Sequence, residues 1–352
     1  MAELPSFLHL VTTNRHEGTI VWLCDMGLNL NSANRLEDTV LLFCRKQDVL
    51  ILREEPNEMY LLELVRLGFE LPHIIVLKEA SVRTSISFEI LNNKRVLKSL
   101  VDLACQRRNV YLLSYTVTES EEKLAFTCGM TLIGTPSCLA NNVKSSSFIK
   151  TVSEKLGFPT DNESVEHSTE RTADAYYHIF INPNGRIEVL TIKCKVINDN
   201  IYYRCMDNGQ VIGAYLYNLG CRGVVGIRSM ITKADVVIPI INMESNFTLY
   251  SYISFIEYIL SKMKICSRLF FVLTGNVKHY SELNRRLEKN RTFFHSHSAR
   301  GEFVYKVRPS HPVSKDRTGC FGEEVFVLIM ISNWVEFETL KNLLILLKEE
   351  LS

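Results

Sequence analysis

The chain has 352 residues, of which 46% are hydrophobic and 22% are charged, a composition that is typical of globular proteins and excludes general disorder. It holds 40 Lys and Arg residues against 39 Asp and Glu residues, and the net charge of +1 predicts no polyanionic partner for the whole molecule. The longest apolar run, residues 325–331, is far shorter than the roughly 20 residues of a membrane helix. The opening residues Met-Ala-Glu-Leu-Pro-Ser lack the pattern of a secretory signal, so we expect a cytoplasmic protein of two or three domains without a membrane contact.

The cysteines also favour a reducing compartment. None forms a C-x-x-C motif, and most lie within apolar stretches such as 21–24 and 42–44. We therefore expect small buried side chains rather than a disulfide scaffold or a zinc site. The ten cysteines are residues 24, 44, 105, 128, 138, 194, 205, 221, 266 and 320.

The first 140 residues alternate short β-rich runs with helical patterns. Pro56 precedes one helical pattern and Gly68 follows it, and a capping box of Thr118 and Glu121 opens another helix that ends at Gly129. Strands that alternate with helices predict parallel βαβ units in an α/β layer. The predicted strands are 18–24, 48–52, 74–77 and 110–113, and the other predicted helices are 57–67 and 94–105.

The sequence changes in character after residue 159. Residues 160–174 are polar and acidic, which predicts a loop. Segments 176–181 and 187–193 flank Asn182-Pro183-Asn184-Gly185, whose residue types predict the turn of a β-hairpin. Antiparallel strands followed by a helix indicate an α+β part. The further predicted elements are a second hairpin of 195–197 and 201–205, an antiparallel pair of 223–231 and 235–241, and a helix over 248–264.

The last part of the chain predicts a small α/β unit, and the sequence has no internal repeats. Its predicted strands are 268–274, 302–307 and 324–331, and its predicted helices are 280–290 and 335–350.

A lysine and a Gly-x-Pro motif bound one helical segment. Lys144 stands at the predicted helix start, and Gly157-Phe158-Pro159 ends the helix. This arrangement resembles the entry to the ATP-grasp fold. The block 118–134 resembles the end of the pre-ATP-grasp domain, which precedes that fold in a group of bacterial peptide and carboxylate–amine ligases. The resemblance implies that Lys144 reaches the nucleotide phosphates, a contact that suits a compact charge on a long stem.

Two later segments resemble motifs of the same superfamily and occur in the same order along the chain. Residues 219–227, with Gly223 and Gly226, resemble the helix end and Gly-rich turn that lead into the metal-ligand strands. Residues 239–244 lie where the superfamily has Glu-Ile-Asn-x-Arg, which places Asn242 at the Asn of that motif. The resemblance implies that these residues contact bound ATP and Mg²⁺.

The resemblance covers most of residues 45–265. It implies an α/β pre-ATP-grasp domain over 1–140, a truncated ATP-grasp core of antiparallel sheet and helices over 141–265, and a C-terminal α/β cap over 266–352. It also implies ADP-forming joining of a carboxylate to an amine, with a carboxylate, amino acid or peptide as ligand.

The sequence departs from the superfamily where a ligase needs its metal ligands. Mg²⁺ requires oxygen ligands, but Arg228 stands at the first acidic position, Ile240 at the Glu of the motif and Glu244 at its Arg. Only 16 residues separate Pro159 from Tyr176, where the family has a lid subdomain, and a short polar loop cannot close over ATP. We therefore predict a ligase-derived protein with lost or reduced ATP-dependent ligation, which retains a binding role or partners another protein.

Two other functions stay open. The first is an active ligase whose metal ligands are rerouted to Glu244, Asp235 and Glu188. The second is a nucleic-acid-associated module that uses residues 278–318. This segment contains ten Lys or Arg and only four Asp or Glu, interspersed with aromatic residues. Since acidic residues elsewhere balance the chain, we favour a solvated face for that segment over nucleic-acid binding.

Single features also have structural interpretations. Lys144 is also consistent with a solvent-exposed residue at a helix end. Gly220, Gly223 and Gly226 are consistent with tight turns as well as with backbone N–H groups that bind an anion. His295-Ser296-His297 would place two imidazoles on one side of a strand, but no third metal ligand is apparent nearby.

Overall fold

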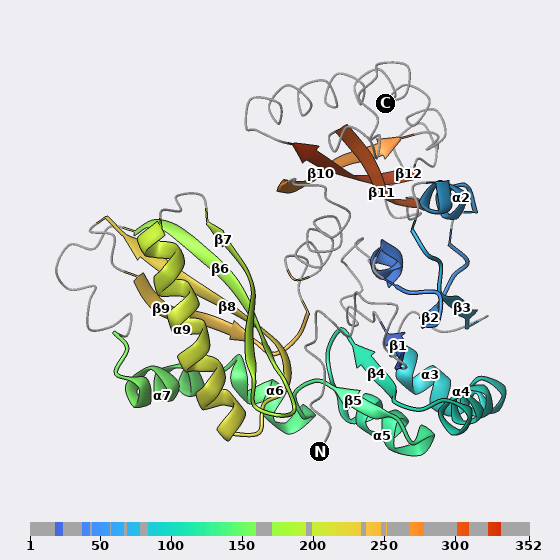
Figure 1. The fold of residues 1–352 in the computed structure, drawn as a ribbon, viewed down its shortest axis with the longest axis horizontal. Coiled ribbons are helices and arrows are strands. Elements are labelled where there is room, and N and C mark those ends of the chain that lie inside the picture. Colours follow the sequence, from blue (N-terminus) through green and yellow to red (C-terminus); the bar gives the residue numbers. More distant parts are fainter. Residues whose placement is uncertain are drawn as a thin grey trace.

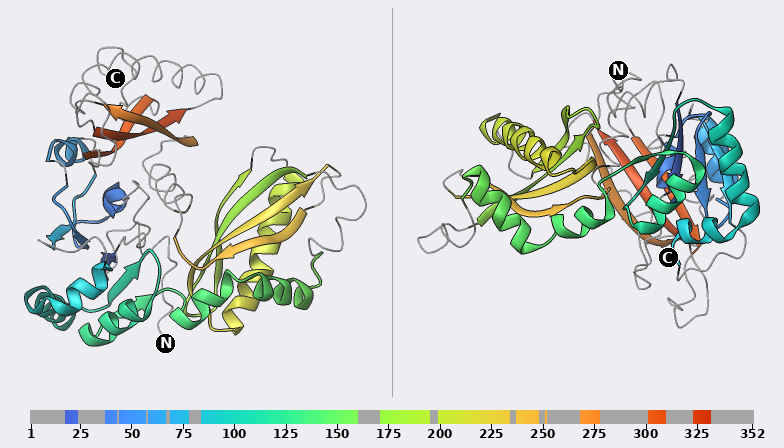
Figure 2. Two further views of the ribbon diagram at one scale, coloured as in Figure 1. Left: turned by 180° about the vertical axis from the view of Figure 1, so that it is seen from behind. Right: turned by 90° about the horizontal axis from the view of Figure 1, so that it is seen from below.

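The structure, a computed structural model, is shown from three sides in Figures 1 and 2. No helix in its described segments has the length and apolarity that crossing a membrane requires. The residues described are 18–23, 37–42, 44–56, 58–66, 69–77, 84–159, 171–194, 199–233, 237–247, 251, 268–277, 301–309 and 323–331.

A parallel β-sheet forms the first part of the chain (Figure 1). Its strands are β1 (Thr19–Leu23), β2 (Val49–Leu52), β3 (His73–Val76), β4 (Val110–Ser114) and β5 (Thr131–Ile133). They stand in the order β3-β2-β1-β4-β5, and each neighbouring pair is parallel. β1, β2 and β4 are buried along their whole length, as central strands of a covered parallel sheet are. The predicted α/β layer is thus confirmed, and β5 is an addition to it.

The helices of this part begin and end at local sequence signals. In α5 the Thr118 hydroxyl accepts from the Ser120 N–H at 3.2 Å, the Glu121 carboxylate accepts from the Thr118 N–H at 2.8 Å, and Gly129 ends the helix at φ 69°. Leu100 and Leu124 are buried in the core that the helices form with the sheet. The elements are the 3₁₀ helix η1 (Glu37–Leu42), α2 (Glu58–Arg66), α3 (Ile86–Asn92), α4 (Lys94–Gln106) and α5 (Glu119–Cys128), of which η1 and α3 were not predicted.

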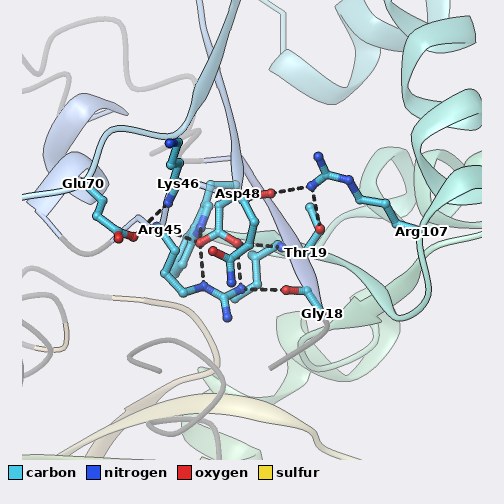
Figure 3. A network of polar contacts seen from close by, with 10 residues as sticks. Gly18, Thr19, Arg45, Lys46, Asp48, Glu70 and Arg107 are labelled. Atoms are coloured by element: carbon cyan, nitrogen blue, oxygen red, sulfur yellow. Dashed lines mark hydrogen bonds and ion pairs between the residues drawn. The ribbon is translucent and has the colours of Figure 1, made fainter. Parts of the chain in front are cut away.

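Asp48 fixes the amino-terminal edge of this sheet (Figure 3). Its buried carboxylate accepts from the Ile20 N–H at 3.0 Å and from the Arg45 guanidinium, with an Nη2–Oδ1 distance of 2.7 Å. Arg45 also donates to the Gly18 carbonyl at 3.0 Å, and the His73 N–H donates to the Asp48 carbonyl at 2.9 Å. Ligands of open α/β sheets bind at the opposite edge, where the strands end. The Asp48 network is therefore structural.

An antiparallel sheet forms the middle of the chain (Figures 1 and 2). Its strands are β6 (Arg171–Ile181), β7 (Ile187–Cys194), β8 (Gly223–Thr232) and β9 (Val237–Glu244). They stand in the order β7-β6-β8-β9, and all neighbours are antiparallel. The associated helices are α6 (Ser137–Val143), α7 (Ser146–Leu156) and α9 (Asp199–Asn218). This arrangement confirms the predicted hairpin, the predicted pair of 223–231 with 235–241, and the α+β class.

Helix α9 lies against β6 and β7, and two of its glycines permit a close approach. A Cβ atom on Gly213 would lie 2.6 Å from Cγ2 of Ile187, and one on Gly209 would lie 3.1 Å from Cγ2 of Val189. The buried face of α9 repeats at helical spacing and joins the same core as α7. The residues of α9 on that face are Ile201, Cys205, Gly209, Ile212, Gly213 and Leu216.

Three predictions for this region are wrong. Residues 201–205 belong to α9 and not to a second hairpin, because their apolar side chains continue a helical repeat that packs on the sheet. The loop predicted over 160–174 ends earlier, since β6 begins at Arg171 and pairs with β8. Lys144 is the residue that caps the C-terminus of α6, and Ser145 rather than Lys144 is the N-cap of α7, which begins at Ser146.

A third sheet has the order β10-β12-β11 and is antiparallel. Its strands are β10 (Arg268–Val277), β11 (Gly301–Pro309) and β12 (Glu323–Ile331), which confirms the three strands predicted for the last part. The predicted helices 280–290 and 335–350 lie outside the described residues, as does 248–264 apart from Ser251, which is helical.

The parallel and antiparallel sheets meet at a tight joint. The Thr135 hydroxyl donates to the Arg222 carbonyl at 2.6 Å, and the Phe247 N–H donates to the Tyr115 carbonyl at 2.9 Å. A Cβ atom on Gly223 would lie only 2.8 Å from the Cα of Gly134. The start of β8 and the end of β9 therefore contact the segments that follow β5 and β4.

Candidate functional site

The two faces of the antiparallel sheet differ in chemistry. Side chains alternate along a strand, and the odd-numbered residues of β6 from Ala175 to Ile181 pack in the core with α7 and α9. The other face carries the polar and charged residues, and we call it the polar face. Its members are Asp174, Tyr176, His178, Arg228, Asn242 and Glu244.

The strand register brings these residues together. Tyr176 on β6 lies opposite Arg228 on β8, which in turn lies opposite Asn242 on β9. In the neighbouring row, Gly226 stands between His178 and Glu244. Since directly opposed residues have Cβ atoms about 4.5–5.5 Å apart, each row forms a continuous surface across three strands.

Arg228 and Asp174 form the ion pair of the polar face. Arg228 Nε and Nη2 donate to the same oxygen, Asp174 Oδ2, at 3.1 and 2.8 Å. The Arg228 side chain is 35% exposed and that of Asp174 is 14% exposed. The hydrogen bond to Asp174 raises the pKa of Arg228, and the guanidinium carbon lies 5.8 Å from the centre of the Tyr176 ring. The position that the resemblance assigns to a metal-binding acid thus holds a fixed cation.

A bulge in β9 sets the position of Asn242. Between the pairs Arg228–Asn242 and Met230–Ile238, one residue of β8 faces three residues of β9. The bulge contains Pro239, which has no N–H to lose from the ladder. The Tyr177 and Ser229 hydroxyls both donate to the Pro239 carbonyl from the core side, at 3.1 and 2.5 Å. Burial raises the pKa of Tyr177, which keeps this phenol protonated as a donor.

His178 is the buried base of the polar face. Its side chain is 2% exposed, and burial lowers its pKa from 6.5 to about 4. The imidazole is therefore neutral at pH 7. The neighbouring Gly226 adds no side chain between His178 and Glu244.

The structure brings together some of the predicted site residues and separates others. Gly226 and Asn242 lie on neighbouring strands, in adjacent rows of the polar face. Gly223 begins β8 at φ 81° and abuts Gly134, so it serves the joint between the sheets. Lys144 is exposed at the end of α6, outside these rows. Its phosphate contact and the nucleotide roles of the other three residues stay predictions.

Glu188 and Glu244, two of the three carboxylates proposed as rerouted metal ligands, lie on opposite edge strands of the sheet. Among the described residues, no three His, Cys, Asp or Glu side chains gather in a way that could hold a metal. Glu188 on β7 and Glu244 on β9 have β6 and β8 between them, so about 14 Å separates their strands at about 4.8 Å per spacing. Mg²⁺ holds its ligands at about 2.1 Å, and these two carboxylates cannot share one ion. Asp235, the third rerouted ligand, lies outside the described residues.

Two other candidate sites fall outside what the structure describes. His295 and His297 are among the residues that are not described, and so is most of the basic segment 278–318. Of that segment, the structure gives the backbone of β11, which is an edge strand of the third sheet and pairs with β12. Metal or nucleic-acid binding there stays a prediction.

The ion pair itself was missed from the sequence. Asp174 was assigned to a loop, although the alternation of polar and apolar residues from Asp174 to Ile181 is the pattern of a half-buried strand. That pattern places Asp174, Tyr176 and His178 on one face. The partner Arg228 is 54 residues away, and no local signal specifies the pairing.

The first part of the chain is a recognised domain. Residues 37–130 match the family described as Pre ATP-grasp domain, which confirms the expected pre-ATP-grasp module in the parallel α/β sheet. No curated protein sequence matches the chain.

Solved structures resemble the chain at low identity. One is pyruvate carboxylase T882A of Rhizobium etli with acetyl coenzyme A, at 11% identity and a TM-score of 0.49, covering 91% of this chain and 34% of that one. This chain thus spans about a third of that protein's length. A second is the ADP complex of purK, N5-carboxyaminoimidazole ribonucleotide synthetase, at 10% identity and 0.48, covering 93% and 95%. A third is the L-amino acid ligase of Bacillus licheniformis, at 10% identity and 0.48, covering 94% and 98%.

Proposed function

We propose that this chain is an ATP-grasp ligase-derived protein in which ATP-dependent carboxylate–amine ligation is lost or reduced. In this proposal residues 1–140 are the pre-ATP-grasp domain, 141–265 a truncated ATP-grasp core and 266–352 a C-terminal cap. The protein retains a binding role for a nucleotide, carboxylate, amino acid or peptide, or it partners another protein in the cytoplasm.

The ion pair of Arg228 and Asp174 carries the proposal. A ligase of this kind needs a carboxylate for Mg²⁺ at the position of Arg228. A metal ion bound through Asp174 Oδ2 would have to take this oxygen from the guanidinium, to which it is bonded at 2.8 and 3.1 Å. Arg228 would then stand beside a dication without its carboxylate, and like charges 4 Å apart repel by about 4 kcal/mol per unit charge pair at an effective dielectric constant of 20.

The other acids do not replace that ligand. Glu244 is the acid of the polar face that lies nearest to Asn242 in sequence, and Glu188 lies on the far side of β6. The Glu188 carboxylate also accepts from Asn182 Nδ2 at 2.7 Å, which holds it at the hairpin. Glu188 therefore cannot serve beside Glu244 as a second ligand of a rerouted metal site.

An ADP-release assay tests the loss of ligation. The full chain with Mg-ATP and a mixture of the twenty amino acids is expected to release no more ADP than it does without amino acids. Release that depends on amino acids and disappears in Lys144→Ala would show an active ligase and contradict the proposal. Lys150→Ala is the matched control, because Lys150 is exposed on α7 and pairs with Glu154 at the surface.

A thermal-shift titration tests the retained binding role. A ligand that binds the native state raises Tm, by about 2.7 kcal/mol of added stability at a hundredfold excess over Kd. Nucleotides, amino acids and short peptides are compared in the same buffer. A shift without ADP release is the expected result for a binding protein that has lost ligation.

A further inference from the structure

We infer that the exposed side of helix α4 binds an acidic segment of a partner protein. The cations of this surface are Lys94, Arg95 and Lys98 on α4 and Arg108 just beyond its end, and we call them the basic face. Figures 1 and 2 show α4 at the outer edge of the molecule, away from the antiparallel sheet. Helix α4 belongs to the parallel-sheet part of the chain, so this surface goes beyond the proposed function and does not depend on whether ligation is lost.

Positive charge is concentrated on this part of the chain. Residues 84–109 hold five Lys or Arg against two Asp or Glu, whereas the whole chain has a net charge of +1. One of the five, Arg107, donates to the Gln47 carbonyl at 2.8 Å and to the Thr19 hydroxyl at 2.9 Å, which holds it against the sheet. The four cations of the basic face are exposed, and such a local excess of positive charge attracts an anionic partner.

The acidic residues of the described segments do not neutralise the basic face. Within those segments its four cations form no ion pair. Asp102 follows Lys98 by four residues on the same helix and is not paired with it. Glu89, the other acid of residues 84–109, accepts a hydrogen bond from the Thr84 hydroxyl. The charge of the basic face is therefore left for a partner.

Two of the cations stand where the helix itself disfavours them. Lys94 and Arg95 occupy the first turn of α4, beside the partial positive charge of the helix N-terminus, and this turn contains no acidic residue. In α5, by contrast, the first turn holds three acids, Glu119, Glu121 and Glu122. A carboxylate of a partner at this end of α4 is attracted by both cations and by the helix dipole. Local choices that oppose the fold in this way are expected at functional sites.

Phe88 supplies an apolar contact beside the cations. Its side chain is 49% exposed, and it precedes Lys94 by six residues. Asn93 is both the C-cap of α3 and the N-cap of α4, so a single residue joins the two helices. One exposed aromatic residue is ordinary on a protein surface, but aromatic residues and arginine together are the usual anchors of protein interfaces.

The arrangement of charges favours a protein segment over a nucleic acid. The 13 residues of α4 span about 20 Å, and Asp102 interrupts the positive charge between Lys98 and Arg108. A nucleic-acid strand carries a negative charge at every nucleotide, also opposite Asp102. An acidic protein segment can place an uncharged residue there and a large apolar residue on Phe88.

Fluorescence anisotropy of a labelled acidic peptide, titrated with the full chain, tests this inference. The peptide is a helix-forming sequence about 20 Å long, with glutamates along one side and one leucine. Its control has glutamine in place of every glutamate. We expect the glutamate peptide to bind, more weakly as salt is raised, and the glutamine peptide not to bind.

Charge reversal identifies the surface. The combined change Lys94→Glu, Arg95→Glu and Lys98→Glu is expected to weaken binding about tenfold or more. Glutamate in the first turn suits the helix dipole, so this variant is expected to fold with a Tm no lower than that of the wild type. The same three positions changed to glutamine give a second variant, which removes the charge without reversing it. The control reverses three exposed cations on other helices and is expected to leave Kd unchanged: Lys150, Lys155 and Arg204.

Two further readouts separate docking from general attraction of charge. Phe88→Ala is expected to weaken binding severalfold without altering its salt dependence. Cys105 is exposed and follows Lys98 by two helical turns, so bound peptide is expected to slow its alkylation by a maleimide. Cys138, which is exposed on α6, is the internal control and should keep its rate.

The result that overturns the inference differs for each measurement. No binding of the glutamate peptide, equal losses in the two charge-reversed variants, an unchanged Kd in Phe88→Ala, or equal protection of the two cysteines would do so. A thymidine oligonucleotide that binds more tightly than the peptide would also overturn it, because the basic face would then serve a nucleic acid. The ADP-release assay decides the proposed function separately, and neither result determines the other.

Discussion

The Arg45 guanidinium and the Asp48 carboxylate form a buried ion pair at 2.7 Å, with side chains 4% and 0% exposed. The pair closes the amino-terminal edge of the parallel sheet, and the Asp48 carboxylate also accepts from the Trp22 indole N–H at 3.4 Å. Removing one partner of such a pair leaves the other charge buried and uncompensated.

Asp48→Ala is therefore expected to lower the free energy of unfolding by about 3–5 kcal/mol. Urea unfolding followed by the fluorescence of Trp22, in a Trp334→Phe background, measures this loss for the part of the chain that contains the parallel sheet. The control is Lys150→Ala, which breaks a surface pair with side chains 62% and 58% exposed and is expected to cost about 0.5 kcal/mol or less. Equal losses in the two variants would show that burial of the pair does not matter.

His178 predicts a fall in stability on mild acidification. Its pKa is lowered from 6.5 to about 4 by burial, so between these pH values the unfolded chain binds a proton that the folded chain does not. The contribution of His178 to the free energy of unfolding does not change above pH 6.5. As the pH falls from 6.5 toward 4, the free energy of unfolding decreases by about 3 kcal/mol in total. Urea midpoints at pH 5 and pH 7 measure the slope.

His178→Gln isolates this contribution, because glutamine does not titrate. The variant is expected to be less dependent on pH between 5 and 7 than the wild type. His73→Gln, at an exposed position that begins β3, is the control and should keep the wild-type slope. An unchanged slope in His178→Gln would assign the pH dependence to another group.

Local sequence signals predicted many of the helices and strands. The elements that were predicted wrongly depend on packing between residues far apart in the sequence. The capping box of Thr118 and Glu121, with Gly129 at the other end, specifies α5 within a dozen residues, and the structure has it as predicted. The start of α9 was mistaken for a hairpin, because Asn198-Asp199-Asn200 suits a turn as well as a helix start. Its glycines also lower helix propensity, and their use is apparent only once Gly213 is seen against Ile187.

The candidate site was predicted only in part for a similar reason. Asn242 was placed by motif order, and the structure puts it on a strand next to Arg228. Its exact neighbour depends on the bulge at Pro239, which is held by hydroxyls from two other strand positions. No periodicity in the sequence specifies a bulge of this kind.

The joint between the sheets predicts a difference between two glycines. Gly223 and Gly129 both have positive φ, at 81° and 69°, so alanine is strained at either position. At Gly129 a Cβ meets nothing within 4 Å, whereas at Gly223 it lies 2.8 Å from the Cα of Gly134. Gly129→Ala is expected to cost about 1–2 kcal/mol and Gly223→Ala about 1–3 kcal/mol more, since backbone must move. Thermal unfolding of both variants measures the difference, and equal Tm values would show that the joint is loosely packed.

The bulge in β9 predicts non-additive effects of its two hydroxyl donors. Tyr177→Phe and Ser229→Ala each remove one hydrogen bond to the Pro239 carbonyl and leave the other, so each is expected to cost about 0.5–1.5 kcal/mol. The double variant leaves this carbonyl without either hydroxyl donor and is expected to cost about 1 kcal/mol more than the sum. A double-mutant cycle by urea unfolding measures the coupling. Strict additivity would mean that water or a shift of β9 replaces the lost donors, and that Asn242 is not held in its row by these two side chains.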